Sequence, residues 1–314
     1  MSKDYSNLIK YLDGSVYTVF TAFNKKLEID YLSIEKYLDF LNSYNVKIFY
    51  VMPYNSRYSQ LREKEIFDLN KFCIDKIKSF TDAKIIVSDC IHGPTELKKE
   101  YCLHAKELGA DIFASICREK YFSDDQILAH YEVMNSCNIP ILVHVMPFLS
   151  GYNAKNMGWP ISIFDGLCKL DNVIAIKEDT KDVEYSIHLL KKFEPRLRFI
   201  FAGRKKYFLE LFNHGLKSYL NGTSIICPDI DNIFLKLINQ NFKLAEKFVK
   251  EVDDPFWDVL VKKYGWHRVN KASLEKIQMM KRFERLPMIS LNNLDYKDVG
   301  EWVDNTLEKI KLWK

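Results

Sequence analysis

The sequence predicts an α/β fold, a (β/α)8 TIM barrel with a C-terminal helical extension. Eight short apolar runs alternate with segments of helical periodicity, and their starts lie roughly 20 to 40 residues apart, about what a strand, a helix and two loops occupy. The chain has no Gly-x-Gly-x-x-Gly turn, which a doubly wound nucleotide-binding sheet would favour. Beyond about Asp229 the pattern is helical only.

The apolar runs define the expected elements. The strands are predicted at residues 16–20, 46–52, 84–88, 112–116, 141–145, 173–177, 198–202 and 218–221. Helical periodicity marks residues 31–44 and 94–108, the second with an N-terminal proline and a glycine stop. We therefore expect a barrel over residues 1–228 and helices packed on it over residues 229–314, since no Gly/Ser-rich linker separates the two parts.

Composition excludes several classes of function. The 314 residues are 47% hydrophobic and 28% charged, which is typical of a soluble globular protein. A net charge of +4 without a basic cluster argues against nucleic-acid binding, and no apolar stretch reaches the length of a membrane span. The seven cysteines form no Cys-x-x-Cys pair, so we expect no structural zinc and a cytoplasmic location.

Lys177 is the most informative residue, because it ends the apolar run 173–177. Strand alternation predicts that Val173, Ala175 and Lys177 face the barrel interior and that Ile174 and Ile176 face the helices. Burial disfavours an ammonium, and a neutral amine is a nucleophile that forms a Schiff base with a carbonyl. The alternative is a lysine that leaves the strand and reaches water.

In this fold the active site lies at the carboxyl ends of the strands. Those ends nominate Thr21, Asn55, Arg57, His144, Lys177, Gly203 and Arg204, together with Leu220 in the last strand. Lys177 and His144 fall on adjacent predicted strands, with both side chains facing the barrel axis. No set of His, Asp or Glu has metal-ligand spacing, so no metal is expected.

Several short motifs follow one another in a specific order and spacing. They are Thr21-Ala22-Phe23, Gly109-Ala110-Asp111, Val143-His144-Val145-Met146-Pro147, Ile176-Lys177-Glu178, Gly203 and Arg285-Leu286-Pro287. Together they resemble the dihydrodipicolinate synthase/N-acetylneuraminate lyase family of class I aldolases, over nearly the whole barrel and into the extension. The resemblance implies that Lys177 forms a Schiff base with pyruvate or a related 2-keto acid, without a cofactor. It also implies a homodimer or homotetramer.

Departures from the family pattern change the expected site. The segment that holds the keto-acid carboxylate aligns with residues 53–57, where Tyr54, Asn55 and Arg57 become the binding candidates. The tyrosine that relays protons on strand 5 is replaced by His144, which can do acid–base work or be a hydrogen-bonded structural histidine. A second relay tyrosine is missing after strand 4, where Tyr121 is a partial substitute.

Four cations, Arg57, Arg118, Lys120 and Arg204, lie at predicted strand ends. A ring of positive charge at the barrel mouth would favour an anionic substrate with a second carboxylate or a phosphate. The alternative is that they are solvated or paired with Glu119, Glu178 or Asp179. We expect Asp179 and Thr180 only to help orient the end of strand 6.

These observations lead to one main expectation and two alternatives. The main expectation is a lyase or synthase of the aldolase type, with Lys177 as nucleophile and a small anionic 2-keto acid as substrate. One alternative is a 2-keto-sugar-acid dehydratase of the same family. The other is a metabolite-binding relative that has lost catalysis.

Overall fold

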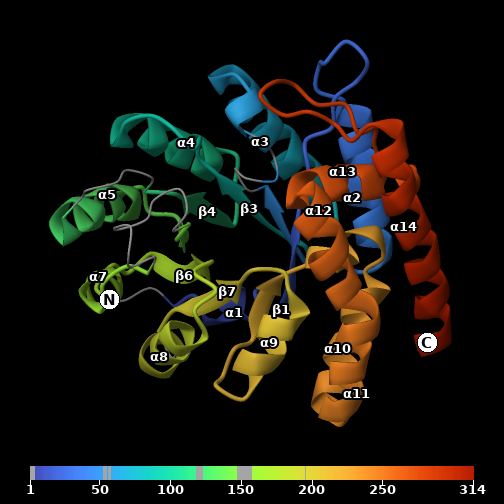
Figure 1. Cartoon of the computed structure of the whole chain (residues 1–314). Helices are drawn as coiled ribbons and strands as arrows, with labels where there is room; N and C mark the ends of the chain where they lie inside the picture. The colour runs from blue at the N-terminus through green and yellow to red at the C-terminus, as the bar shows by residue number, and fades with distance from the viewer. Residues whose placement is uncertain (1–3, 52–54, 56–57, 118–122, 147–157, 195) are drawn as a thin grey trace.

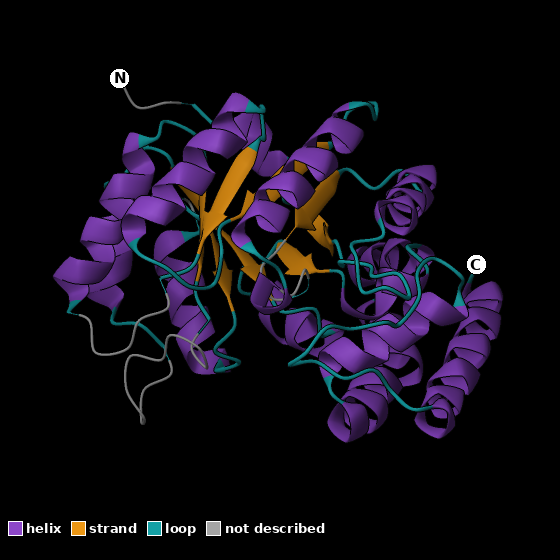
Figure 2. Cartoon of the chain, turned by 90° about the horizontal axis from the view of Figure 1, so that it is seen from above, coloured by secondary structure: helices purple, strands orange, loops and turns teal. Residues whose placement is uncertain are grey.

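Eight parallel strands form a closed barrel in the order β1 to β8, which confirms the predicted fold. The computed structural model describes residues 4–51, 55, 58–117, 123–146, 158–194 and 196–314. The strands are β1 Gly14–Thr18, β2 Ile48–Val51, β3 Lys84–Ser88, β4 Ile112–Ser115, β5 Ile141–His144, β6 Val173–Glu178, β7 Arg198–Phe201 and β8 Ser218–Leu220. Figures 1 and 2 show these strands at the centre, with helices around them.

Alternate side chains of the strands fill the barrel interior. The interior cluster is made by Leu12, Val16, Ile48, Tyr50, Ile86, Ile112, Ala114, Leu142, Ile174, Ala175, Ile200 and Leu220. Tyr5, Leu8 and Ile9, in and beside α1 Ser6–Lys10, pack against this cluster next to Leu12, near the start of β1. The amino-terminal end of the barrel is therefore covered, and the carboxyl ends of the strands are left to form a site.

An irregularity at the start of β6 changes the predicted alternation. Ile141 pairs with Val173, whereas the next residue, Leu142, pairs with Ala175, so one extra residue of β6 bulges out of register. Ile174 consequently joins the interior cluster, and Val173 packs in the outer core with the helices. The predicted faces were wrong for these two residues and right for Ala175 and Ile176.

The helices that alternate with the strands bury apolar faces against them. They are α2 Tyr31–Ser43, α3 Glu63–Lys78, α4 Thr95–Glu107, α5 Asp124–Ser136, α7 Ile161–Leu167, α8 Val183–Phe193, α9 Lys205–Phe212 and α10 Asp229–Gln240, with a short 3-10 turn at η1 Tyr58–Gln60 and another at η2 Gly222–Ile226. Phe234 of α10 meets Tyr219 of β8 edge-on at 6.0 Å between ring centroids. This contact makes α10 the helix that follows and covers β8.

The remaining helices gather on one side of the barrel, drawn from orange to red in Figure 1. They are α11 Phe242–Phe248, the π-helices η3 Val249–Asp253 and η4 Phe256–Val261, α12 Lys262–Tyr264, α13 Trp266–Lys276 and α14 Asn293–Trp313. None of the helices in the described ranges is long and apolar enough to cross a bilayer. The division of the chain at residues 228 and 229 stays a prediction.

Buried lysines join this helical part to the barrel. Lys205, which is completely buried, lies 2.8 Å from Asp231 of α10 and 3.8 Å from Asp253 of η3. Lys271 of α13 donates to the backbone carbonyl of Thr21 at 2.7 Å. Because a buried charge without a partner is costly, these contacts hold the helices in one position over the carboxyl ends of the strands.

Candidate active site

Lys177 and His144 are direct neighbours across β5 and β6, as predicted. Lys177 is 2% exposed and His144 is fully buried. Parallel strands lie about 4.8 Å apart, so the amine and the imidazole belong to one small volume above the apolar interior. Burial holds the pKa of His144 well below its usual value, and the charge of Lys177 lowers it further. His144 is therefore a neutral imidazole.

His144 is oriented by a tyrosine from another strand. The Tyr50 hydroxyl of β2 lies 3.0 Å from His144 Nδ1. When Nδ1–H donates to this oxygen, Nε2 keeps a free lone pair. Nε2 is buried and has no hydrogen-bond partner in the described part of the chain. The arrangement gives His144 one fixed nitrogen and one nitrogen with a free lone pair, and His144 is not among the described residues that line the pocket at Lys177.

Asp179 contacts the amine directly, with 2.9 Å between its Oδ2 and Lys177 Nζ. It follows Lys177 by two positions, so strand alternation directs both side chains to the same side. The sequence therefore held a signal for this pair, although it suggested only an orienting role for Asp179. The carboxylate can compensate a positive charge on this nitrogen and exchange protons with it.

Lys177 and Asp179 open into a pocket of about 250 Å³. Its wall is completed by Asn55, Met146, Lys181, Ala202, Gly203, Arg204, Tyr207, Leu220, Trp257, Val261 and Trp266. Of the predicted substrate-binding residues, this wall brings together Asn55, Gly203, Arg204 and Leu220. About half of the lining residues are apolar, and the polar groups among them can fix a ligand's orientation.

Asn55 presents an unused donor to this site. Its Oδ1 accepts the Trp266 indole N–H at 3.0 Å, which fixes the amide orientation. Its Nδ2 is buried and has no partner among the described residues. A buried amide N–H without a partner is costly, so a ligand oxygen would satisfy it. This geometry fits the predicted role of Asn55 as a donor to a carboxylate.

Arg204 lines the pocket but is neutralised by two carboxylates. Its Nη2 lies 3.1 Å from Asp254 and 2.8 Å from Asp258, both in the C-terminal helices. Sequence reasoning offered only Glu119, Glu178 or Asp179 as partners for such cations. The actual partners lie about 50 residues further along the chain, beyond the reach of a local pattern.

Two glycines make one edge of the pocket possible. A side chain on Gly203 would meet the backbone of Gly222 at 2.6 Å, and one on Gly222 would meet the Gly203 carbonyl at 2.0 Å. Gly222 also has a φ of +54°. The loops after β7 and β8 can touch only because both positions lack a Cβ.

The other predicted site residues fall elsewhere. Thr21 is buried and its carbonyl binds Lys271, and it does not belong to the described wall of the pocket. Tyr54, Arg57, Arg118, Lys120 and Tyr121 lie outside the described residues. Their predicted roles stay predictions.

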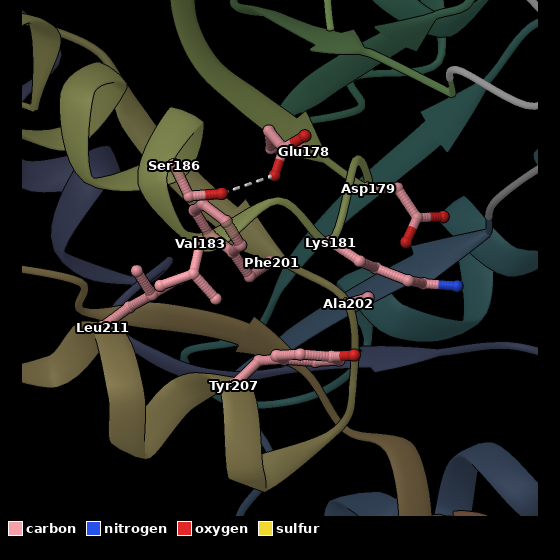
Figure 3. A pocket seen from close by; sticks show the side chains of 9 residues that line it. All are labelled: Glu178, Asp179, Lys181, Val183, Ser186, Phe201, Ala202, Tyr207 and Leu211. Carbon is pink, nitrogen blue, oxygen red and sulfur yellow. Dashed lines mark hydrogen bonds between the residues drawn. The ribbon is translucent and has the colours of Figure 1, made fainter. Parts of the chain in front are cut away.

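A second, much smaller cavity lies beside the first, with a volume of about 10 Å³ (Figure 3). Asp179, Lys181, Ala202 and Tyr207 border both cavities. Glu178 lies on its far side, where Ser186 Oγ donates to its carboxylate at 3.3 Å, and burial raises its pKa to about 7. The space holds about one water molecule, so it is no substrate site.

Metal ligands are a further possibility for a site of this kind. Within the described ranges, His, Cys, Asp and Glu form no group of three or more that could hold a metal ion. The polar groups that line the pocket are instead two amines, a carboxylate, an amide, a phenol and a paired guanidinium. These groups suit carbonyl chemistry at Lys177.

Solved structures share this fold over almost their full length. A dihydrodipicolinate synthase from Oceanobacillus iheyensis superposes with a TM-score of 0.85 at 15% identity, covering 97% of this chain and 100% of that one. An N-acetylneuraminate lyase from Mycoplasma synoviae gives a TM-score of 0.79 at 20% identity, covering 94% of this chain and 98% of that one. At these identities the likeness establishes the fold.

Sequence comparison extends the likeness to curated proteins. The chain is 23% identical over 313 residues to an uncharacterized DapA-like lyase of Pyrococcus furiosus, covering 96% of this chain and 97% of the relative. It is 21% identical over 280 residues to a 4-hydroxy-tetrahydrodipicolinate synthase of Staphylococcus carnosus, covering 87% and 90%. A profile of the dihydrodipicolinate synthetase family matches residues 95–306, more than half of the chain. The chain therefore belongs to the dihydrodipicolinate synthetase family.

Proposed function

We propose that this protein is a Schiff-base-forming lyase of 2-keto acids, with Lys177 as its nucleophile. The observation that carries the proposal is the buried Lys177 amine at the pocket, 2.9 Å from the Asp179 carboxylate and beside the neutral His144. Asp179 can accept the proton of this amine, and the pocket can admit a carbonyl compound that the amine then attacks.

Each residue has a distinct task in the proposed reaction. Asp179 takes one proton from the Lys177 ammonium, and the neutral amine attacks the keto carbon. A second N–H proton moves to the keto oxygen to give the carbinolamine, and Asp179 returns its proton to that hydroxyl, which leaves as water. The Asp179 carboxylate then stabilises the positive iminium. Asn55 Nδ2 donates to the substrate carboxylate, and the free Nε2 of His144 accepts the proton of a substrate hydroxyl.

The iminium serves as an electron sink, which permits more than one outcome. Cleavage of the C3–C4 bond releases an aldehyde, while loss of a hydroxyl group from the same intermediate makes a dehydratase. The products distinguish the two.

Assembly as a homodimer or homotetramer and a cytoplasmic location also stay proposals. Light scattering of the purified protein tests the oligomeric state.

Exchange of the pyruvate methyl protons with D2O, followed by NMR, tests this proposal. Schiff base and enamine formation should make the wild-type protein catalyse the exchange, and Lys177→Ala should abolish it. Lys206→Ala, which removes an exposed lysine outside the described pocket wall, is the matched control and should exchange normally. Folded wild-type protein without exchange would favour the metabolite-binding relative, and exchange by Lys177→Ala would exclude the proposed nucleophile.

A further inference from the structure

The C-terminal helices give the pocket an aromatic wall. Trp257 and Val261 come from η4 and Trp266 from α13. The two indole rings are stacked, with 5.0 Å between centroids and 5° between planes. Phe256 braces Trp266 edge-on at 5.9 Å. These contacts hold a flat apolar surface in a fixed orientation.

The backbone that carries this wall is unusual. Trp257 lies in a π-helix, a conformation that is rare and often found at functional sites. Gly265, with a φ of +87°, separates α12 from α13 immediately before Trp266. The Trp257 indole nitrogen is buried and has no partner in the part of the chain that the structure describes. The wall thus offers a ligand both a flat face and an unused N–H donor.

Charge around this wall does not favour a second anion. Arg204 is bound by Asp254 and Asp258, and Lys181 also lines the pocket, so these four described side chains together carry no net charge. An anionic group placed beside them would find no net positive charge among these four side chains, because two carboxylates already bind the Arg204 guanidinium. The distal part of the substrate should therefore be uncharged.

The volume fits a ring joined to a short keto acid. A closed apolar cavity of about 150 Å³ accepts benzene. The pocket here measures about 250 Å³, which leaves space for a three-carbon keto acid at Lys177 beside one aromatic ring. A flat ring on a tryptophan face gains both apolar burial and stacking.

We propose that the substrate is a 2-keto acid with a hydroxyl and an aryl group at C4, and that the Trp257–Trp266 wall binds the aryl ring. The Schiff-base chemistry rests on the proposed function; the aromatic wall does not. The C4 hydroxyl gives its proton to His144 Nε2, the C3–C4 bond breaks, and its electron pair neutralises the iminium as an enamine. An aromatic aldehyde leaves, the enamine gains a proton at C3, and water releases pyruvate from Lys177.

Aldol synthesis from pyruvate, quantified by mass spectrometry, compares benzaldehyde with the anionic succinic semialdehyde. We expect kcat/KM for benzaldehyde to be at least 10-fold higher. Trp257→Leu should lower it by about 10- to 100-fold, as loss of an aromatic contact surface predicts. Trp313→Leu, a tryptophan outside the described pocket wall, is the control. Equal rates for the two aldehydes, or no effect of Trp257→Leu, would overturn the proposal.

Freeing Arg204 provides a test in the opposite direction. Asp258 is exposed, so Asp258→Asn should fold, and Asp254→Asn can be combined with it. The double variant should raise the rate with succinic semialdehyde relative to benzaldehyde by about 10-fold, because the guanidinium can then bind a carboxylate. An unchanged ratio would contradict the part given to these two aspartates.

A binding measurement separates failure of this inference from failure of the proposed function. Borohydride trapping of pyruvate reads the Schiff base alone. Calorimetric titration with 4-phenylbutanoate, which has no keto group, reads binding without a Schiff base, and the comparison with Trp257→Leu isolates the aromatic wall. Binding that weakens at least 10-fold in Trp257→Leu would support the wall even without a pyruvate adduct. A pyruvate adduct without 4-phenylbutanoate binding would leave the lyase standing and overturn the aryl site.

Discussion

Removing the charge of Asp179 should destabilise the protein far more than removing an exposed aspartate. Asp179 Oδ2 lies 2.9 Å from Lys177 Nζ, and the side chains are 10% and 2% exposed. At this distance the attraction is about 6 kcal/mol with an effective dielectric constant of 20 and about 1.4 kcal/mol in bulk water. The pocket admits some water, so we expect Asp179→Asn to cost about 2 to 4 kcal/mol.

A double-mutant cycle isolates this interaction. The free energies of unfolding of wild type, Asp179→Asn, Lys177→Met and the double variant are obtained from urea unfolding followed by tryptophan fluorescence. A coupling energy of at least about 2 kcal/mol is expected, because each single change leaves one buried polar partner uncompensated. Asp68→Asn breaks an exposed pair with Lys64 and should cost less than about 1 kcal/mol. Coupling no larger than this control effect would refute the pairing.

Three further perturbations test other parts of the site and fold. Burial lowers the pKa of His130 to about 3, so the folded protein loses stability as pH drops below about 6.5, where the unfolded chain binds a proton and the folded one does not. By pH 5 the loss in the free energy of unfolding is about 2 kcal/mol. His130→Gln should remove this pH dependence in urea unfolding measured from pH 7.5 to 5. Gly222→Ala should cost at least about 2 kcal/mol more than Gly215→Ala, because only the first places a Cβ against backbone, and equal thermal shifts would contradict this. Tyr50→Phe should cost about 1 to 3 kcal/mol and slow aldol synthesis from pyruvate and an aldehyde while leaving the Lys177 adduct intact, since it removes the partner of His144 Nδ1; an unchanged aldol rate would argue against a role for His144.

Local patterns were sufficient for the parts of the fold that repeat. Strand alternation and spacing placed Lys177 beside His144, and the structure confirms that contact between β5 and β6. The same alternation was wrong for Val173 and Ile174, because a bulge inserts one residue and leaves no mark in the apolar pattern. Periodicity describes regular strands and does not detect such an irregularity.

The pocket wall depends on contacts between distant segments, and the sequence alone does not indicate which of these segments meet. Trp266 meets Asn55 across 211 residues, and Arg204 meets Asp258 across 54. Trp266 and Asp258 lie in C-terminal helices, for which the sequence predicted only packing on the barrel. Asp179 is different, because its spacing of two from Lys177 already indicated a shared face.

Borohydride trapping with peptide mapping tests the central claim most directly. The protein is incubated with pyruvate, reduced and digested, and the mass of every lysine-containing peptide is measured. We predict a reduced pyruvate adduct on Lys177 and none on Lys181, which borders the same pocket, or on the buried Lys205. An adduct on another lysine, or none on folded protein, would contradict the assignment of Lys177 as the nucleophile.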